Sequence, residues 1–248
     1  MLNFRHLALA TIAAPLALGL AACSSDEESA TNGEPVAAVA APAGSEWSQT
    51  ASRTAEGGWL VGNPDAPIKL VEYGSLTCPA CALFSTEGSR PLHENYIDTG
   101  RVSFEFRSVM IHGILDLLIT RVLECAPTEV AVPMADQVWA NVNDLTGQFS
   151  ANQAAVEAAY DLPDDQRFVA MAQSGGLTEF FAARGLSGDQ TEVCLADSAA
   201  MTTLADTTQA QATEDAVTGT PTFFLNGARV DSTRWAEVEG ALQRAGAR

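Results

Sequence analysis

The chain has 248 residues, which is enough to bury a substantial core in one large domain or two small ones. Its 31 acidic side chains outnumber its 13 lysines and arginines and give a formal net charge of −18. No basic stripe or block is present, so the charge argues against nucleic acid as a partner and favours solubility without indicating a substrate.

The first 22 residues have the pattern of an export signal. A short positive head, MLNFRH, precedes the apolar run LALATIAAPLALGLAA, which ends in small residues. A buried apolar helix is the alternative, but nothing amphipathic follows the run. The run is also shorter than the roughly 20 residues that a membrane-spanning helix needs. We therefore predict a signal peptide over residues 1–22.

The signal ends in LAAC, which resembles the lipobox of bacterial lipoproteins. The resemblance implies that Cys23 becomes the lipidated first residue of the mature protein and anchors it to a membrane. Ser24 after it resembles the outer-membrane sorting pattern of Gram-negative bacteria. The expected location is the bacterial cell envelope, facing the periplasm, at the outer rather than the inner membrane. The alternative is a soluble export signal that leaves Cys23 as an odd thiol.

A flexible tether is predicted over residues 23–58. This segment is rich in serine, alanine, glycine, proline and acidic residues and lacks a sustained helical or strand period. By the scaling for Gly/Ser-type linkers, about 35 such residues reach roughly 30–35 Å. The tether would hold the following domain near a membrane.

A strand, a helix and a second strand are predicted between residues 59 and 112. The apolar segment from Ile68 to Tyr73 follows a group of turn residues and indicates a buried strand. The next segment, ALFSTEGSRPLHENYIDTG, suits a helix that Pro91 should kink or split. RVSFEFRSVMI then alternates apolar and polar residues, as a half-buried strand does.

The rest of the chain is predicted to be helical, with a second group of strands near the end. Residues 113–216 contain several helical segments and no convincing strand. TPTFFLNG then indicates a strand, and Asn226-Gly227 a hairpin turn. A closing amphipathic helix is expected to be capped by Asp231 or Ser232. The order is βαβ, a helical insertion and ββα, which predicts an α/β fold.

Two cysteines three residues apart, Cys78 and Cys81, stand where the first strand gives way to the helix. In the first turn of a helix their sulfurs share a face and can bridge. A sulfur at the helix start also faces unpaired N–H groups and the positive end of the helix dipole, which lower a thiol pKa. We predict that Cys78 exchanges disulfides with partners and that Cys81 resolves them. Pro79 suits the first helical position, where its missing N–H costs nothing.

Two other interpretations of the cysteine pair are weaker. A zinc site needs four ligands, usually in two close pairs, but the remaining cysteines of the mature chain, Cys125 and Cys194, are solitary, and it has only His93 and His112. A structural disulfide between such close residues would constrain the unfolded chain little. The sequence favours a redox-active pair that needs no metal and no cofactor.

Three segments together resemble the DsbA-like branch of the thioredoxin superfamily, which are exported thiol–disulfide oxidoreductases. They are GNPDAPIKLVEYGSLTCPACALF, VTGTPTFFLNG and the helical block between them. The resemblance implies a thioredoxin-like fold, with halves over residues 59–112 and 217–248 and an all-helical subdomain inserted over residues 113–216.

The same resemblance implies a function. The protein would exchange disulfides with cysteine-containing polypeptides, as an oxidase in protein folding, with a reductase or isomerase as the alternative. A membrane partner of the DsbB type would recharge an oxidase, and one of the DsbD type a reductase. A non-catalytic chaperone or binding lipoprotein with a static bridge is a further possibility from another class.

The resemblance also assigns roles around the pair. Thr220-Pro221 matches the family's cis-proline loop, which lies against the cysteines and offers its backbone to a bound peptide. Glu72 matches a partly buried acid beneath the active site. A carboxyl desolvated in an apolar strand would have a raised pKa and could exchange protons with Cys81. The alternative for Glu72 is a solvent-facing position on a half-exposed strand.

The dipeptide Pro79-Ala80 departs from the family pattern. DsbA itself has a histidine in the second place, so Ala80 removes one group that favours the thiolate. The sequence therefore predicts a less strongly oxidising couple than that of DsbA and leaves the direction of electron flow open. His112, before Gly113 at the end of a strand, could lie near the active site, and a satisfied loop histidine is the preferred interpretation.

Cys125 and Cys194 lie in separate predicted helices, 69 residues apart. In an oxidising compartment a structural disulfide between them is expected, and the alternative is two small buried side chains. We expect a monomer, because dimerising relatives usually add an amino-terminal domain for which the segment before residue 59 is too short and polar.

Overall fold

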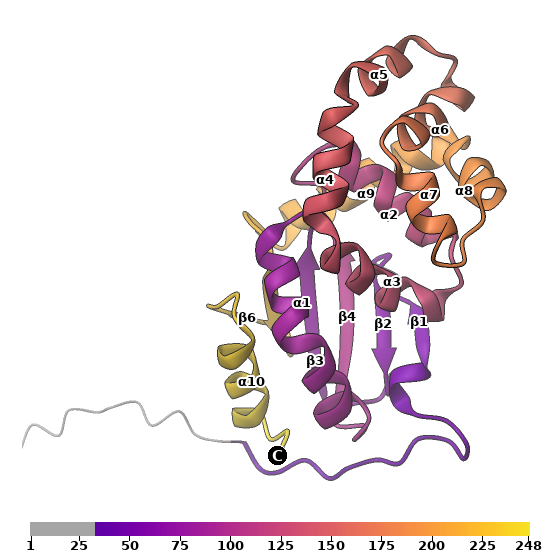
Figure 1. The fold of residues 1–248 in the computed structure, drawn as a ribbon. Helices are drawn as coiled ribbons and strands as arrows, with labels where there is room; N and C mark the ends of the chain where they lie inside the picture. The colour runs from indigo at the N-terminus through magenta and orange to yellow at the C-terminus, as the bar shows by residue number, and fades with distance from the viewer. Residues whose placement is uncertain (1–32) are drawn as a thin grey trace, which may run out of the picture. The chain divides into compact units, whose positions relative to one another are not determined.

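The computed structural model describes residues 33–248, so the predicted signal peptide, Cys23 and the first part of the predicted tether lie outside the described residues. A six-stranded sheet has the order β1-β2-β4-β3-β5-β6 (Figure 1). Its strands are β1 (Ala51–Arg53), β2 (Trp59–Gly62), β3 (Ile68–Gly74), β4 (Val102–Ser108), β5 (Thr222–Leu225) and β6 (Ala228–Val230). The α/β fold class predicted from the sequence is confirmed.

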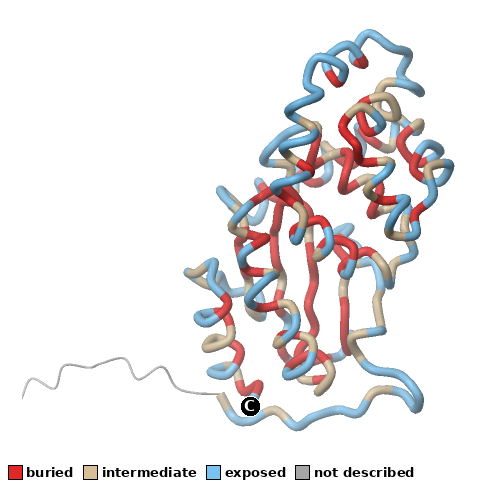
Figure 2. Tube along the Cα trace, in the orientation of Figure 1, coloured by how far each residue is buried: buried red, intermediate tan, exposed pale blue. Residues whose placement is uncertain are grey.

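The central strands β3 and β4 run parallel, from the pair Ile68 and Val102 to the pair Gly74 and Ser108. Most of their residues are buried, as expected for strands that are covered on both faces. Their carboxyl ends meet at one edge of the sheet, and the chain leaves β3 there to begin the first long helix. Figure 2 shows the buried residues gathered along these strands and at the junction with the helices above them.

One face of the sheet is covered by α1 (Pro79–Leu92) and α10 (Trp235–Arg244), which pack against each other. Phe84 of α1 lies against Phe223 of β5, with ring centroids 4.3 Å apart. Pro91 lies inside α1, and the helix continues beyond it as a π-helical turn over His93–Ile97. The sequence predicted a kink or a split at Pro91, and the chain instead changes its helical hydrogen-bonding pattern just after it.

The segment between β4 and β5 is helical throughout and lies mainly beyond the carboxyl edge of the central strands (Figure 1). The helices are α2 (Ile114–Cys125), α3 (Thr128–Ala140), α4 (Val142–Ala151), α5 (Gln153–Ala158), α6 (Asp164–Ser174), α7 (Leu177–Ala182), α8 (Gly188–Leu195) and α9 (Ser198–Glu214). Of these, α3 returns toward the sheet and packs against α1, β1 and β2.

Two strands of the sheet were not predicted from the sequence. Strands β1 and β2 form a hairpin in which Arg53 pairs with Trp59, and β2 adds to β4. The Arg53 guanidinium lies 4.1 Å from the centre of the Trp59 ring. Each strand has only three or four residues, so its alternation is too short to stand out, and their stability comes from pairing with a distant strand.

The predicted tether is wrong from residue 33 onward, because the chain there is bound to the domain. The Val36 N–H donates to the Gly246 carbonyl over 2.9 Å, and the Val39 N–H donates to the Thr99 carbonyl over 2.9 Å. The Trp47 indole packs against the core. These contacts could not be predicted from the sequence, because main-chain hydrogen bonds and isolated buried apolar residues produce no helical or strand period.

The closing hairpin and helix agree with the prediction in outline and differ at the cap. Asn226 and Gly227 both have positive φ, 50° and 82°, as the predicted two-residue hairpin turn requires. Helix α10 begins at Trp235 with Arg234 as its N-cap, so the predicted caps at Asp231 and Ser232 are wrong. The helix starts where Trp235 enters the core beside Phe84 and Tyr96, and this burial sets its first turn.

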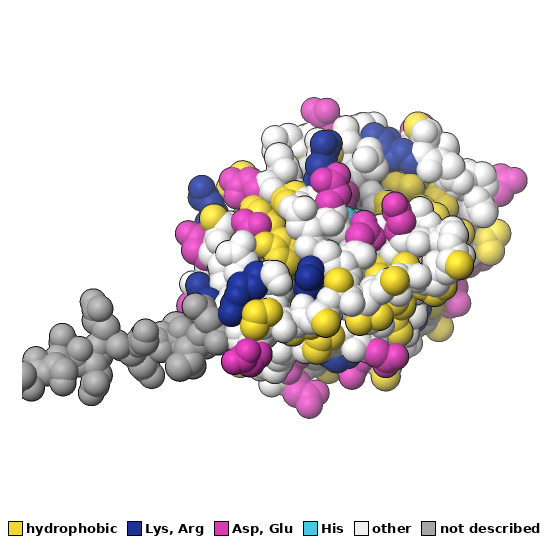
Figure 3. Space-filling view, turned by 90° about the horizontal axis from the view of Figure 1, so that it is seen from below, with side chains coloured by type: hydrophobic (Ala, Val, Ile, Leu, Met, Phe, Trp, Pro, Cys, Tyr) yellow, Lys and Arg dark blue, Asp and Glu magenta, His cyan; other side chains and the backbone are white. Residues whose placement is uncertain are grey.

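The surface carries both signs of charge. In the view from below, acidic side chains are spread over the face, with lysines and arginines among them and apolar side chains between (Figure 3). Within residues 33–248, no helix is long and apolar enough to cross a membrane.

Candidate active site

The cysteine pair lies at the start of α1, just beyond the carboxyl end of β3. Cys78 is the N-cap residue, with φ −83° and ψ 122°, and Pro79 occupies the first helical position. Cys81 lies one turn inside the helix and is fully buried, and Cys78 is 5% exposed. Both are free thiols in the structure. Cys78 is therefore the outer sulfur of the pair.

The loop before β5 lies directly against this sulfur. Thr220-Pro221 is a cis peptide bond, and the Cys78 Sγ lies 3.4 Å from the Thr220 carbonyl oxygen. The Thr220 hydroxyl oxygen is buried and has no hydrogen-bond partner among the described residues. Residues 142 positions apart thus form one surface around the reactive atom. A main chain held beside the sulfur offers an edge to which an extended peptide can hydrogen-bond.

The two thiols have opposite acidities. Hydrogen bonding from the Cys81 thiol, with further hydrogen bonding from the backbone N–H groups of Cys81 and Ala80, lowers the pKa of Cys78 to about 5, although burial opposes the change. Burial raises the pKa of Cys81 far above its ordinary range, and the neighbouring Cys78 and Glu72 act in the same direction. At neutral pH the pair therefore consists of a Cys78 thiolate and a Cys81 thiol.

The reduced protein is expected to show this asymmetry directly. Its thiolate absorbance in the ultraviolet should appear with a midpoint near pH 5 when the pH is raised from an acidic value. A Cys81→Ala variant should titrate at higher pH, because the strongest hydrogen-bond donor to the thiolate is gone. A midpoint close to the ordinary cysteine pKa of about 8.5 in the wild-type protein would contradict the assignment.

Glu72 lies beneath the pair in the middle of the central strand β3. It is 1% exposed, and its Oε1 atom has no hydrogen-bond partner among the described residues. A Cβ atom at Gly74 would come within 2.9 Å of that oxygen, so position 74 leaves the carboxyl its space. Burial raises the pKa of Glu72 well above its usual range, and the nearby Asp136 and Cys78 add to the effect. The half-exposed alternative considered from the sequence does not apply.

A Glu72→Gln substitution should change how stability depends on pH. Above the unfolded-state pKa of about 4.3 the unfolded chain has released a proton that folded Glu72 keeps, so the free energy of unfolding falls as the pH rises. The glutamine amide cannot ionise, so we expect the variant to be more stable than the wild-type protein by about 1–3 kcal/mol at mildly basic pH and little changed at acidic pH.

Urea unfolding of the oxidised protein over a range of pH measures this difference, because the cysteines then do not titrate. Glu94→Gln, on an exposed position, is the matched control for the loss of one carboxyl group. An identical pH slope in Glu72→Gln and the wild-type protein would show that Glu72 ionises as freely when folded as when unfolded.

A buried polar cluster beside the pair was not predicted from the sequence. Asp116, in the first turn of α2, is 0% exposed and accepts hydrogen bonds from Ser75 and Thr77, the residues just before Cys78. The Trp139 indole N–H donates to the Ser75 carbonyl over 2.9 Å. An aspartate within the apolar segment ILDLLITRVL was the available signal, because a charged residue on the buried face of a helix needs partners.

The other two cysteines of the described chain are joined to each other. A disulfide links Cys125, at the end of α2, to Cys194 of α8, with Cα atoms 6.1 Å apart. Cys125 is exposed, so the alternative of two small buried side chains does not apply to it. Within residues 33–248, no three His, Cys, Asp or Glu side chains are placed to hold a metal ion together.

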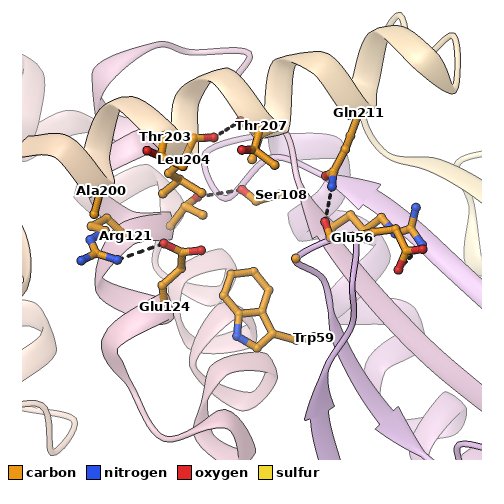
Figure 4. A pocket seen from close by; sticks show the side chains of 14 residues that line it. Glu56, Trp59, Ser108, Arg121, Glu124, Ala200, Thr203, Leu204, Thr207 and Gln211 are labelled. Atoms are coloured by element: carbon orange, nitrogen blue, oxygen red, sulfur yellow. Dashed lines mark hydrogen bonds and ion pairs between the residues drawn. The ribbon is translucent and has the colours of Figure 1, made fainter.

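A separate cavity lies between the sheet and the helical block. It has a volume of about 370 Å³ and is bounded by the Trp59 ring, by Arg121 and Glu124 of α2, and by Leu204 of α9 (Figure 4). The Arg121 guanidinium pairs with Glu124 at 3.1 Å along its wall. Neither Cys78 nor Cys81 lines this cavity. The cysteine pair therefore lies outside it, at the start of α1, beside the cis-proline loop.

A dithiol at the start of a helix, beside a cis-proline loop on a mixed sheet, defines a thioredoxin-like site. The sequence pattern of the family described as Thioredoxin matches residues 54–244, so the chain belongs to the thioredoxin family.

Similarities to individual proteins are consistent with membership of this family. The structure is similar to the protein-disulfide isomerase from Novosphingobium aromaticivorans, with 25% identity, a TM-score of 0.66 and coverage of 74% of this chain and 94% of that one. It also has the fold of alpha-DsbA1 from Wolbachia pipientis, with 20% identity, a TM-score of 0.61 and coverage of 79% and 94%. A 54-residue segment is 39% identical to Disulfide bond formation protein D of Bacillus subtilis (strain 168) and covers 22% of this chain and 24% of that protein. The chain spans between 21% and 65% of the length of the curated relatives that it matches.

Proposed function

We propose that this protein is a thiol–disulfide oxidoreductase that exchanges disulfides with cysteine-containing polypeptides through Cys78 and Cys81, and that it works as an oxidase. The observation that carries the proposal is the arrangement of Cys78, an outer thiolate at a helix N-terminus, against the Thr220 carbonyl, with a buried protonated Cys81 behind it. The names of the relatives, a disulfide bond formation protein and a protein-disulfide isomerase, support it.

The reaction follows from these positions. A substrate thiolate attacks the Sγ atom of Cys78 in the oxidised pair, the Cys78–Cys81 bond breaks, and its electron pair goes to the Cys81 sulfur. Cys81 takes up a proton, for which the buried Glu72 is the nearby donor. The second substrate thiolate then attacks the substrate sulfur of the mixed disulfide. Cys78 leaves as a stable thiolate, and the substrate has gained a disulfide.

The low pKa of Cys78 favours the oxidase direction. A couple oxidises strongly when its reduced form is stabilised, and a thiolate with a pKa of about 5 stabilises the reduced form. The value lies between about 3.5 for DsbA and about 7 for thioredoxin. The dipeptide between the cysteines has Ala80 where DsbA has a histidine. A Cys78 pKa above that of DsbA is in keeping with a less oxidising couple.

The reduction potential of the Cys78–Cys81 couple, measured against glutathione buffers, tests the direction. We expect a value between those of DsbA, about −120 mV, and thioredoxin, about −270 mV, and on the oxidising side of the glutathione pool. A potential at or below that of thioredoxin would indicate that the protein is a reductase and not an oxidase. A pair inert toward dithiothreitol and glutathione would instead support a non-catalytic binding protein.

The proposal includes a place for the protein in the cell. The signal-like residues 1–22 and the LAAC sequence support export and lipid attachment at Cys23, and Ser24 supports the outer membrane. A partner of the DsbB type would reoxidise the pair, and the protein would act as a monomer without a bound cofactor. A Cys23→Ser variant expressed in a Gram-negative host should move from the membrane fraction to the soluble fraction, and continued membrane attachment would exclude the lipid anchor.

A further inference from the structure

A histidine beside the active site is held from two directions. His112 lies in the loop between β4 and α2, where its main-chain N–H donates to Asp116 Oδ2 over 2.8 Å. Its ring Nδ1 atom lies 2.7 Å from the Thr77 hydroxyl oxygen. Thr77 is the residue immediately before Cys78. An exposed loop side chain is thus fixed to the segment that carries the reactive sulfur.

The donors and acceptors around Asp116 determine which ring nitrogen carries the hydrogen. A carboxylate only accepts, and Asp116 Oδ1 lies 2.9 Å from the Thr77 hydroxyl oxygen. The single hydroxyl hydrogen of Thr77 therefore points to Asp116. The contact between Thr77 and His112 must then use a hydrogen on the ring, so Nδ1–H donates and the hydroxyl oxygen accepts.

The Asp116 carboxylate accepts further hydrogen bonds, which hold Thr77 and His112 in this arrangement. Asp116 also accepts from the Ser75 hydroxyl over 2.9 Å and from the Thr77 N–H over 3.0 Å. It is completely buried, whereas His112 at the other end of the chain of hydrogen bonds is exposed. Neutral His112 is left with an Nε2 atom that bears a lone pair and no hydrogen.

We propose that His112 is a general base for the incoming substrate thiol, and that Thr77 and Asp116 are its positioning residues. The inference deepens the proposed function and rests on it. A substrate thiol is mostly protonated at neutral pH, since its ordinary pKa is about 8.5, whereas Cys78 is activated by its own surroundings. Proton removal from the substrate is the activation that the cysteine pair does not itself supply.

The proposed step balances in protons and electrons. His112 Nε2 accepts the substrate S–H proton as the substrate sulfur attacks Cys78, and the electron pair of the Cys78–Cys81 bond moves to Cys81. The resulting imidazolium releases its proton to solvent, to which His112 is exposed. The substrate sulfur is oxidised and Cys81 is reduced. The Pro79-Ala80 dipeptide lacks a histidine, and the loop before α2 supplies one from a different part of the chain.

The test compares two small thiols reacting with the oxidised full chain at neutral pH, in the wild-type protein and a His112→Gln variant. One is 2-mercaptoethanol, which is almost entirely protonated, and the other is the more acidic trifluoroethanethiol, of which a substantial fraction is ionised. Glutamine can donate the same hydrogen bond but cannot accept a proton. We expect the variant to react about tenfold or more slowly with 2-mercaptoethanol and within about twofold of the wild-type rate with trifluoroethanethiol.

Two further measurements test the role of His112 independently of the His112→Gln variant. Thr77→Val, which removes the hydroxyl that orients the ring, should slow 2-mercaptoethanol selectively and to a smaller extent. Nitrogen NMR of the wild-type ring should show hydrogen on Nδ1, and hydrogen on Nε2 alone would overturn the proposal whether or not a variant folds. Equal slowing of both thiols, or no slowing, would also overturn it. A wild-type protein that reacts with neither thiol would instead defeat the proposed function.

Discussion

A Cys78→Ser variant is expected to lose disulfide exchange with reduced polypeptides by a factor on the order of a thousand or more. Serine cannot form the mixed disulfide, and the remaining Cys81 is buried and holds its proton. A Cys81→Ala variant should instead react once and stop. Its Cys78 thiolate can still attack a disulfide of a partner and form a mixed disulfide, but no second thiol is left in the pair to release it.

Mixed disulfides trapped in cells that express each variant provide the measurement, read on non-reducing gels and reversed by dithiothreitol. Cys81→Ala should accumulate them, and Cys78→Ser should not. The double variant with both substitutions is the matched control, because it keeps the fold and the Cys125–Cys194 bridge but has no redox thiol. Trapping through Cys81 in Cys78→Ser would reverse the two roles.

The features that could be predicted from the sequence depend on residues that are close together along the chain. The start of α1 at Cys78 follows from the apolar strand, the cysteine spacing and Pro79. The turn at Asn226-Gly227 follows from residue types that tolerate positive φ. The position of Thr220-Pro221 beside the pair came from family resemblance, because nothing local relates residues 142 positions apart.

The features that were missed depend on tertiary contacts. Strands β1 and β2 are too short to show a period and exist because β2 pairs with β4. The segment from residue 33 is ordered by main-chain hydrogen bonds to the carboxyl-terminal turn, and such bonds do not depend on a particular side chain. Asp116 and Thr77 are 39 positions apart, and only the packing of α2 against the carboxyl edge of the sheet joins them. For the same reason the hydrogen bonds of His112 with Thr77 and Asp116 could not be predicted from the sequence.

Replacing both Cys125 and Cys194 with alanine is expected to lower the free energy of unfolding by about 4 kcal/mol. The bridge closes a segment of 69 residues, so its loss frees a large part of the unfolded chain. It also ties α2 to α8, and α2 carries Asp116. Thiol exchange at Cys78 should persist while the protein stays folded, because the bridge lies outside the cysteine pair.

Urea unfolding of the double variant and the wild-type protein, both with Cys78–Cys81 oxidised, measures the difference without the redox pair contributing. A Cys78→Ser, Cys81→Ala chain that retains the Cys125–Cys194 bridge is the control for removing two sulfurs. The redox pair closes a loop of only three residues, so its removal should change stability less than removal of the structural bridge. A loss below about 1 kcal/mol in the Cys125→Ala, Cys194→Ala variant would mean that the unfolded chain is already restricted there by other contacts, since loop closure would then contribute little.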